Sequence, residues 1–216
     1  MTGDTPSAAQ LNGITDAFTR QLASLGRLRT YPKNTVFITE GDSSDSVFVI
    51  LSGRVKVFIS DTEGHEMILD MQGPGEYVGE MALDGKPRSA SVMTLEPSTF
   101  SVVARDPIRE AIRGNPDFAL DMISKIIDRA RLATNSVKDL ALLDVYGRVA
   151  RLLLNLAVEK EGKLHIPEKI TQQEIAERVG ASRDMVSRIF RDLSAGGYIT
   201  VENRFITINK KPPARW

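Results

Sequence analysis

Four polar side chains in the segment TQQEIAERVGASRDMVSRIFR, residues 171–191, have the types and spacing to read DNA bases. Arg183, Asp184, Ser187 and Arg188 share one face if this part of the chain is helical. Arginine can donate to both O6 and N7 of guanine, and a carboxylate can accept from N4 of cytosine. Asp184 favours base reading, because an acid would be repelled by the phosphate backbone. The alternative is a solvated helix in which Asp184 pairs with Arg188.

Local signals predict two helices joined by a short turn that would position this face. Thr171 and Glu174 form a capping-box pattern at the start of the first helix, and Ser182 can cap the second. Gly180 is suited to end the first helix, because glycine adopts the left-handed conformation at little cost. Each helix has one apolar stripe, formed by Ile175, Ala176 and Val179 in the first and Met185, Val186, Ile189 and Phe190 in the second. A second helix held in this way can enter the major groove of DNA.

A different chemistry is indicated by the segment GEYVGEMALDGKPRSASV, residues 75–92. Two glycines bracket Tyr77, a short turn would then present the backbone N–H groups of residues 80–82, and Arg88 and Ser89 follow. Free N–H groups, an arginine and a hydroxyl suit an anion of the phosphate type. Glu80 would repel phosphate but can accept from a sugar hydroxyl, so the segment indicates a ligand with both groups. The alternative is a surface ion pair between Glu80 and Arg88.

Short runs of β-forming residues separated by glycines surround this segment from about residue 29 to residue 104. Such a pattern predicts a sandwich, barrel or jelly roll. Residues 11–25 carry apolar side chains at helical spacing and predict one short amphipathic helix before the strands. A charged connection is expected at residues 160–169, and a two-stranded wing at residues 198–201 and 204–208.

A long helix is predicted from Asp117 to Leu143, where no proline or glycine interrupts the chain. A narrow seam on a helix of this length favours a contact between two copies of the chain. The alternative is that the seam packs on the β-domain of its own chain. The seam consists of Ala119, Met122, Ile126, Ala133 and Leu140, with the polar Arg129 and Ser136 at the same phase.

The chain has no net charge, but its charges are unevenly distributed. Residues 146–216 hold 13 lysines and arginines against 8 acidic residues, whereas residues 1–145 hold 15 against 20. We therefore expect the C-terminal third to bind nucleic acid and the preceding part to do something else.

The composition excludes several classes of site. The chain contains no cysteine, which removes disulfides, thiolate metal sites and iron–sulfur clusters. No apolar run is long enough to span a membrane and no signal peptide is indicated, so we expect a cytoplasmic protein with no membrane partner. His65 and His165 lie in different regions and form no catalytic or metal-binding pattern, with His65 expected to be exposed in a turn. We therefore expect neither an enzyme, nor a metal site, nor a prosthetic group.

The order of these parts resembles that of the cyclic AMP receptor protein and fumarate–nitrate regulator (CRP/FNR) family of bacterial transcription regulators. The resemblance covers roughly residues 15–210 and implies an α+β fold with three parts. An N-terminal, jelly-roll-like β-roll would bind a cyclic nucleotide, a long helix would form a homodimer, and a C-terminal winged helix-turn-helix domain would read a palindrome. The expected boundaries are 1–105, 106–145 and 146–216. The resemblance rests on the following segments: GD at 41–42, LSGRVKVF, GEYVGEMAL, RSA at 88–90, LALLDVYGRVARLLLNLA and ITQQEIAERVGASRDMVSRIFRDL.

The resemblance also implies individual roles. Glu80 would hold the ribose 2′-hydroxyl, Arg88 and Ser89 the cyclic phosphate, and Arg129 would reach from the long helix toward Glu80. The expected ligand contacts are Val57, Leu69, Gly79, Glu80, Met81, Ala82, Arg88, Ser89, Arg129, Ala133 and Thr134. The expected DNA contacts are Thr171, Gln172, Ser182, Arg183, Asp184, Ser187 and Arg188.

Two departures from the family pattern leave alternatives open. Ala133-Thr134 stands where the cyclic AMP receptor protein has a Thr-Ser pair that touches the adenine amino group. One hydroxyl is lost there, so the choice of base stays open. The resemblance favours cyclic AMP as the effector, with cyclic GMP, cyclic di-GMP or no nucleotide as alternatives. Asp184 stands where the family usually has glutamate, so the half-site can differ from TGTGA. By resemblance, the segment from Glu159 to His165 is a candidate surface for RNA polymerase, although a solvated loop fits it equally well.

Overall fold

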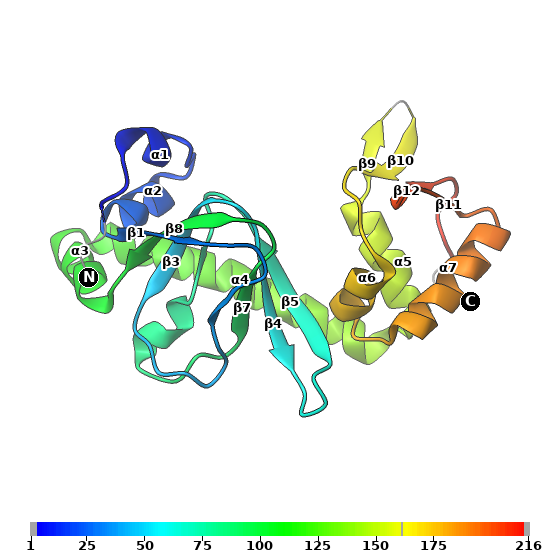
Figure 1. The fold of residues 1–216 in the computed structure, drawn as a ribbon, viewed down its shortest axis with the longest axis horizontal. Helices are drawn as coiled ribbons and strands as arrows, with labels where there is room; N and C mark the ends of the chain where they lie inside the picture. Colours follow the sequence, from blue (N-terminus) through cyan, green and yellow to red (C-terminus); the bar gives the residue numbers. More distant parts are fainter. Residues whose placement is uncertain (1–3, 161, 214–216) are drawn as a thin grey trace. The chain divides into compact units, whose positions relative to one another are not determined.

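The computed structural model describes residues 4–160 and 162–213, with the backbone alone at Ala82. The chain forms two compact units (Figure 1). The first extends through residue 130, except for residues 66–68. Those three residues belong to the second unit, which otherwise runs from Arg131 onward.

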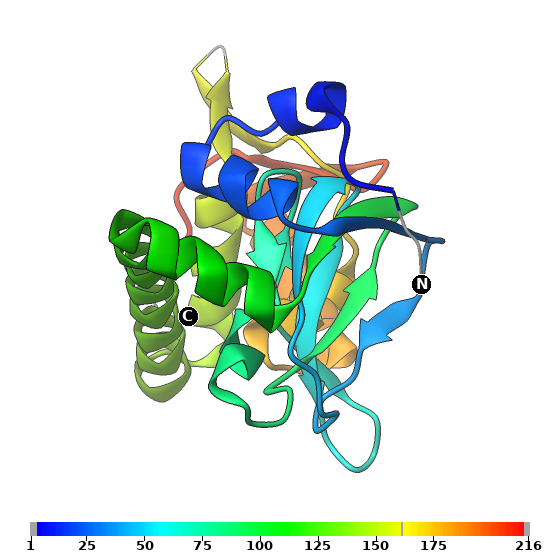
Figure 2. The same cartoon turned by 90° about the vertical axis from the view of Figure 1, so that its left-hand side faces the viewer.

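Two antiparallel, four-stranded sheets form the body of the first unit, as expected for a β-roll. One sheet has the order β1-β8-β3-β6 and the other β2-β7-β4-β5. Helix α2 (Ala17–Ser24) contacts β3 and β8, and Figure 2 shows it lying across them. The strands are β1 (Arg27–Tyr31), β2 (Val36–Ile38), β3 (Val47–Ser52), β4 (Val55–Ser60), β5 (Glu66–Gln72), β6 (Tyr77–Val78), β7 (Ser91–Thr94) and β8 (Ser98–Val103).

Strand β3 is apolar on both faces because each face meets a different core. Val47 and Val49 belong to a cluster that includes side chains of the helices, whereas Phe48 and Ile50 lie in a cluster inside the roll. Successive residues of a strand point to opposite faces, so one strand can serve both clusters. This explains why the sequence here is a continuous apolar run rather than an alternation.

The predicted helix at residues 11–25 is wrong in one respect, because the segment forms two helices. Helix α1 (Ala8–Asn12) is followed by a break, and α2 (Ala17–Ser24) then begins. The carboxylate of Asp16 accepts from the backbone N–H of Thr19 at 2.9 Å and caps the second helix. A strong N-cap starts a new helix, so the apolar periodicity continues while the hydrogen-bonded backbone does not.

Helix α3 (Arg105–Gly114) leads into α4 (Pro116–Leu142), the predicted long helix. The predicted seam is corrected at its N-terminal half. Met122 is buried in the helix-side core of the β-roll, and Arg129 packs on Tyr77 of the same unit, as the alternative expected. An exposed apolar stripe of α4 is shifted by one residue from the predicted seam and consists of Leu120, Ile123, Ile127 and Val137. Ile126 and Leu140, from the predicted seam, are also exposed.

The second unit contains the predicted pair of helices and a larger sheet than expected. Helix α5 (Val145–Leu156) is followed by α6 (Gln172–Val179) and α7 (Arg183–Ala195). The predicted wing is formed by β11 (Ile199–Glu202) and β12 (Phe205–Ile208). The expectation of a plain connection at residues 160–169 is wrong, because β9 (Val158–Lys160) and β10 (Lys163–Ile166) are strands. Together these strands make one sheet of order β11-β12-β10-β9.

Candidate functional site

The side chain of Arg88 is buried inside the β-roll and is held by three acceptors. Its Nη1 donates to the carbonyl of Gly79 at 2.6 Å. Its Nη2 donates to the hydroxyl of Ser44 at 2.6 Å and to the carbonyl of Ser46 at 2.8 Å. Nε is buried and has no hydrogen-bond partner among the described residues. Burial lowers the pKa of Arg88, although attraction to Glu80 opposes this effect.

Gly79 is needed where it stands for both conformational and steric reasons. Its φ of +89° lies in the region that L side chains rarely adopt. A Cβ atom here would lie 2.5 Å from Nη1 of Arg88 and 3.0 Å from the carbonyl oxygen of Ser46. The absence of a side chain therefore lets the guanidinium of Arg88 approach the backbone.

Glu80 is paired with Arg129 of α4. Nη1 of Arg129 lies 2.7 Å from Oε2 of Glu80, and the two side chains are 27% and 10% exposed. The guanidinium carbon of Arg129 also lies 4.5 Å from the ring centroid of Tyr77, and its Nη2 donates to the carbonyl of Tyr77. Burial alone would lower the pKa of Arg129, but attraction to Glu80 outweighs it and raises the pKa. This arrangement fixes α4 to the roll at the acid expected to hold the ribose.

The remaining expected ligand contacts of the first unit are placed as follows. The short helix η1 (Glu80–Asp84) supplies the backbone of Met81 and Ala82. Ser89 is exposed, and its hydroxyl donates to the sulfur of Met81 at 3.2 Å. Leu69 is 48% exposed, and Val57 packs on the core inside the roll.

Tyr77 carries a buried hydroxyl that the sequence pattern did not single out. The residue is 2% exposed, and its hydroxyl has no partner among the described residues. Burial raises the pKa of Tyr77 to about 12, with Arg129 acting in the opposite direction.

Replacing Tyr77 by phenylalanine should stabilise the protein, because an unpaired buried hydroxyl costs about 1–3 kcal/mol. The folded state holds the proton more tightly than the unfolded chain, whose tyrosine titrates near a pKa of about 10. Wild-type stability should therefore fall as the pH rises from about 10 to about 12, and Tyr77→Phe should lack this part of the loss. Urea unfolding of both proteins from pH 7 to pH 12 measures the difference. A variant less stable at pH 7, or with the same alkaline profile, would contradict the prediction.

The second group of candidate residues lies on α6 and α7, and its local signals formed largely as predicted. The hydroxyl of Thr171 accepts from the backbone N–H of Glu174 at 3.1 Å. Gly180 ends α6 in the left-handed conformation, with a φ of 63°. The hydroxyl of Ser182 accepts from the backbone N–H of Met185 at 3.3 Å and caps α7. The expected two helices and turn are therefore confirmed.

Two details of that prediction are wrong. The carboxylate of Glu174 does not complete a capping box but pairs with Arg178 one turn further along α6. Met185, expected in the buried stripe of α7, is 41% exposed, and Leu193 joins the core of α7 instead. The buried face of α7 is therefore shifted toward its C-terminus.

The expected base-reading side chains are exposed or nearly so. Arg183, Asp184 and Arg188 are exposed, and Ser187 is half-buried. Among the residues that the structure describes, no ion pair joins Asp184 to Arg188, so base reading and a solvated helix both stay open at this point. Thr171 and Gln172, at the start of α6, are exposed and half-buried respectively.

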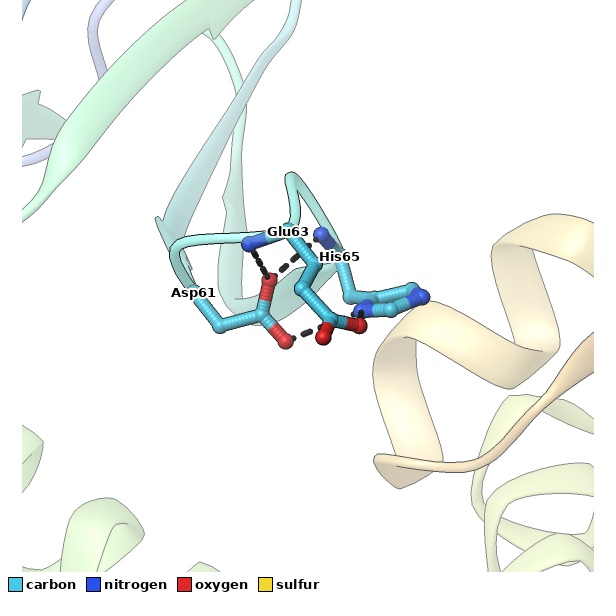
Figure 3. Close-up of polar contacts among 3 residues, drawn as sticks. All are labelled: Asp61, Glu63 and His65. Atoms are coloured by element: carbon cyan, nitrogen blue, oxygen red, sulfur yellow. Dashed lines mark hydrogen bonds and ion pairs between the residues drawn. The ribbon is translucent and has the colours of Figure 1, made fainter.

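A cluster of two acids and one histidine lies on the turn between β4 and β5 (Figure 3). Oδ1 of Asp61 accepts from the backbone N–H groups of Glu63 and His65, and Oδ2 lies 2.9 Å from Nδ1 of His65. The His65 side chain is 74% exposed, which confirms the expectation of a solvent-facing turn. Within the described part of the chain, no group of histidine and acidic side chains could hold a metal ion. Nor does any helix there have the length and apolar character needed to cross a membrane.

Comparison with known proteins identifies the family of the chain. Residues 28–115 match the cyclic nucleotide-binding domain, and residues 147–212 match the Crp-like helix-turn-helix domain. The cAMP-activated global transcriptional regulator CRP of Salmonella typhimurium is 34% identical over 186 residues, which cover 84% of this chain and 89% of that protein. The chain belongs to the CRP/FNR family. The CRP-like cAMP-activated global transcriptional regulator of Mycobacterium tuberculosis is 32% identical over 198 residues, with coverages of 89% and 87%.

Solved structures share this CRP/FNR fold. The c-di-GMP-responsive global regulator CLP of Xanthomonas campestris superposes with a TM-score of 0.78 at 24% identity, covering 90% of this chain and all (100%) of that one. A CRP/FNR regulator from Thermus thermophilus gives a TM-score of 0.69 at 25% identity, with coverages of 85% and 94%. The protein is therefore a CRP-like regulator with a nucleotide-binding domain and a DNA-binding helix-turn-helix domain. Its relatives are transcription regulators and not enzymes.

Within this CRP/FNR architecture, the structure brings Gly79, Glu80, Arg88 and Arg129 together in the first unit. Ala133 and Thr134 lie on α4 within the second unit and are exposed, so their contact with a base stays a prediction. Sequence reasoning missed Ser44 and Ser46, which hold Arg88 from 44 and 42 residues away. The only signal was the polar turn GDSSDS at residues 41–46, which does not by itself point to an arginine so distant.

Proposed function

We propose that this CRP/FNR regulator is a homodimer whose β-roll binds a cyclic nucleotide, cyclic AMP first, and thereby controls binding to a palindromic operator. The state of Arg88 carries the proposal. The residue is 4% exposed, and its Nε–H has no partner among the described residues. An ionised phosphate is well suited to a buried cationic donor, because charge-assisted hydrogen bonds are the stronger ones.

The pairing of Glu80 with Arg129 supports a sugar beside that phosphate. Arg129 offsets the charge of Glu80, so the carboxylate can accept from a ribose hydroxyl with less repulsion of the phosphate. Val57 and Leu69 would line the base, with Met81 and Ala82 supplying backbone and Ser89 a hydroxyl. The hydroxyl of Ser89 would then donate its hydrogen bond to a phosphate oxygen instead of to the sulfur of Met81.

Cyclic AMP is the first candidate because the relatives from Salmonella and Mycobacterium are named as cAMP-activated regulators. Cyclic di-GMP is the second, because the Xanthomonas regulator of the same fold is named as responsive to it. Cyclic GMP and a regulator that needs no nucleotide are the remaining alternatives. Ala133-Thr134 on α4 would decide among the bases, since this pair offers one hydroxyl.

Titration calorimetry with cyclic AMP, cyclic GMP and cyclic di-GMP tests the sensor. We expect cyclic AMP to bind with one site per β-roll. If only cyclic di-GMP binds, the effector is cyclic di-GMP instead of cyclic AMP, and the proposal of a nucleotide-controlled regulator stands. If none of the three binds, the sensor proposal fails while DNA binding stands.

The homodimer is supported by the exposed stripe of α4. Leu120 is 60% exposed, Ile127 46% and Val137 64%, and exposed apolar side chains at such spacing favour a coiled contact between two copies. In a homodimer the two α7 helices would enter successive major grooves about 34 Å apart. A ligand can promote that spacing only by binding the DNA-competent state more tightly.

The DNA contact is proposed for Thr171, Gln172, Ser182, Arg183, Asp184, Ser187 and Arg188. Asp184 is one methylene shorter than the glutamate usual in the family, so selection from a randomised duplex library should return a half-site that differs from TGTGA. Recovery of TGTGA itself would contradict the prediction that Asp184 changes the preferred half-site.

Replacing Arg183 by alanine should cost about 1–3 kcal/mol of binding to the selected duplex and relax preference at one base position. Arg191→Ala is the matched control, since Arg191 is also an exposed arginine of α7 but lies toward its C-terminal half. It should weaken binding to all sequences alike. Fluorescence anisotropy on the selected duplex and on single-base variants measures both. Equal losses on selected and random duplexes for Arg183→Ala would contradict a base contact.

The remaining assignments follow the same architecture. We propose domains at residues 1–105, 106–145 and 146–216 and a cytoplasmic location. The segment from Glu159 to His165 includes parts of the paired strands β9 and β10, and residue 161 lies outside the described residues. Strand β9 is exposed throughout, and we propose that it contributes to a surface for RNA polymerase.

A further inference from the structure

Among the residues that the structure describes, Met81 is the methionine most open to solvent. Its side chain is 62% exposed, and Met185 on α7 follows at 41%. The other described methionines are half-buried or buried; they are Met67, Met71, Met93 and Met122. An oxidant dissolved in water would therefore meet the thioether of Met81 before the others.

The lack of cysteine gives an exposed methionine more weight in this chain. A peroxide reacts readily with an exposed cysteine thiolate, and the sequence contains no cysteine. Methionine is the other side chain that contains sulfur, and its oxidation to the sulfoxide can be reversed by dedicated reductases. The sulfur chemistry of this protein is therefore confined to its methionines.

Met81 lies in the candidate nucleotide site. It is the second residue of η1, directly after Glu80, and its sulfur accepts a hydrogen bond from the hydroxyl of Ser89 at 3.2 Å. Ser89 directly follows the buried Arg88, and its hydroxyl is the one assigned to the phosphate in the proposed function. Because a thioether sulfur is a weak acceptor, a phosphate oxygen can readily replace it.

Oxidation of Met81 would change this competition. Hydrogen peroxide transfers one oxygen atom to the sulfur: the O–O bond breaks, an S–O bond forms, and water is released. The sulfur loses two electrons, and the peroxide gains them. The side chain becomes polar, and its new oxygen carries partial negative charge. This oxygen would accept from the hydroxyl of Ser89 more strongly than the sulfur does, and it would repel a phosphate.

We propose that Met81 is a modification site, at which a peroxide forms a sulfoxide that lowers the affinity of the β-roll for its nucleotide. The oxidised side chain competes with the phosphate for the hydroxyl of Ser89. This inference rests on the proposed nucleotide binding and adds a regulation of that same site. A methionine sulfoxide reductase reverses the change: two thiols are oxidised to a disulfide, and the oxygen atom leaves as water.

Limited treatment of the full chain with hydrogen peroxide, followed by mass spectrometry of its peptides, tests the modification. We expect Met81 to be oxidised first, ahead of Met185 and of the buried Met122. Saturating cyclic AMP should slow the oxidation of Met81, because binding and oxidation oppose each other at one site. Met185 is the internal control, and its oxidation should keep the same rate.

Titration calorimetry with cyclic AMP, before and after peroxide, measures the effect on affinity. The oxidised wild type should bind about tenfold more weakly, because one hydrogen bond to a charged phosphate is lost. Treatment with the reductase should restore the affinity. The circular dichroism and the urea midpoint should be the same before and after peroxide, which shows that the oxidised protein is folded.

Two leucine variants provide matched controls. Met81→Leu keeps an apolar side chain of similar size that peroxide does not oxidise, so its affinity should be the same before and after treatment. The comparison is made within each variant, so an effect of the substitution itself cancels. Met185→Leu removes the other exposed methionine and should retain the tenfold loss.

The inference is overturned if the oxidised wild type binds cyclic AMP as tightly as the reduced protein does. It is also overturned if peroxide weakens binding equally in Met81→Leu, or if bound cyclic AMP leaves the oxidation rate of Met81 unchanged. If the reduced wild type binds none of cyclic AMP, cyclic GMP and cyclic di-GMP, the proposed sensor fails and the inference fails with it. That result is distinct from nucleotide binding that oxidation does not alter, which removes the inference alone.

Discussion

Replacing Arg88 by glutamine is expected to weaken nucleotide binding by about 100-fold or more. The phosphate would lose the buried guanidinium that contacts Gly79, and glutamine cannot supply charge-assisted bonds. Arg88→Lys should recover only part of the loss, because an ammonium cannot hold three protein acceptors and a phosphate in the same geometry. Calorimetry with cyclic AMP measures the three affinities.

Arg113→Gln is the matched control for loss of one arginine in the first unit. Arg113 is exposed on α3 and makes no contact with the pocket residues described above. Its affinity for the nucleotide should equal that of the wild type. An Arg88→Gln protein that is folded, by its circular dichroism and urea midpoint, and binds cyclic AMP as the wild type does would remove Arg88 from the site.

The second large effect is expected at the pair of Glu80 and Arg129. Arg129→Gln leaves a carboxylate that is 10% exposed without its cation. Removing one partner of a buried pair costs about 3–5 kcal/mol, and partial exposure of Arg129 reduces our expectation to about 2–4 kcal/mol. Glu80→Gln should cost less, because Arg129 is 27% exposed and keeps its contacts with Tyr77.

The double variant Glu80→Gln/Arg129→Gln separates the pair from its surroundings. It should be more stable than the sum of the two single losses predicts, by about 1–3 kcal/mol, because no unpaired charge remains. Urea unfolding at pH 7 of all four proteins gives the coupling. Losses that add to within about 0.5 kcal/mol would show that the ion pair contributes nothing of its own.

The helix-turn-helix could be predicted in detail because its signals are local. Thr171, Gly180 and Ser182 contact backbone groups only three or four residues away, so a short stretch of sequence contains both partners of each contact. Glu174 shows the limit of such reasoning. Its carboxylate could bind either the backbone N–H of Thr171 at the start of α6 or the guanidinium of Arg178, and it pairs with Arg178.

The phase of α4 could not be predicted because two apolar stripes share the helix. Met122 and Ile123 belong to stripes one residue apart, and both repeat at spacings of three and four. Only the contacts of Met122 with the β-roll decide which stripe faces the chain's own core. The β9–β10 hairpin escaped notice for a related reason, since all of β9 is exposed and its sequence has no buried side to reveal.

The sequence singled out Glu80 and Arg88 as charged residues of the candidate site but did not reveal which groups they contact. Arg88 and Glu80 are close in sequence, which suggested a pair between them. The structure instead pairs Glu80 with Arg129, 49 positions away, and gives Arg88 the turn at residues 41–46. Long-range partners of this kind leave no periodic signal.

Because Arg88 is buried, nucleotide binding and DNA binding should respond differently to ionic strength. Salt screens exposed charges over about 8 Å at physiological concentration but acts much less on buried ones. Arg88 is 4% exposed, whereas Arg183 and Arg188 are open to solvent and would displace counterions from DNA. Added salt should therefore release the protein from its operator while the β-roll remains loaded. An osmotic change in the cell would then act on the output of this regulator without disturbing what it senses.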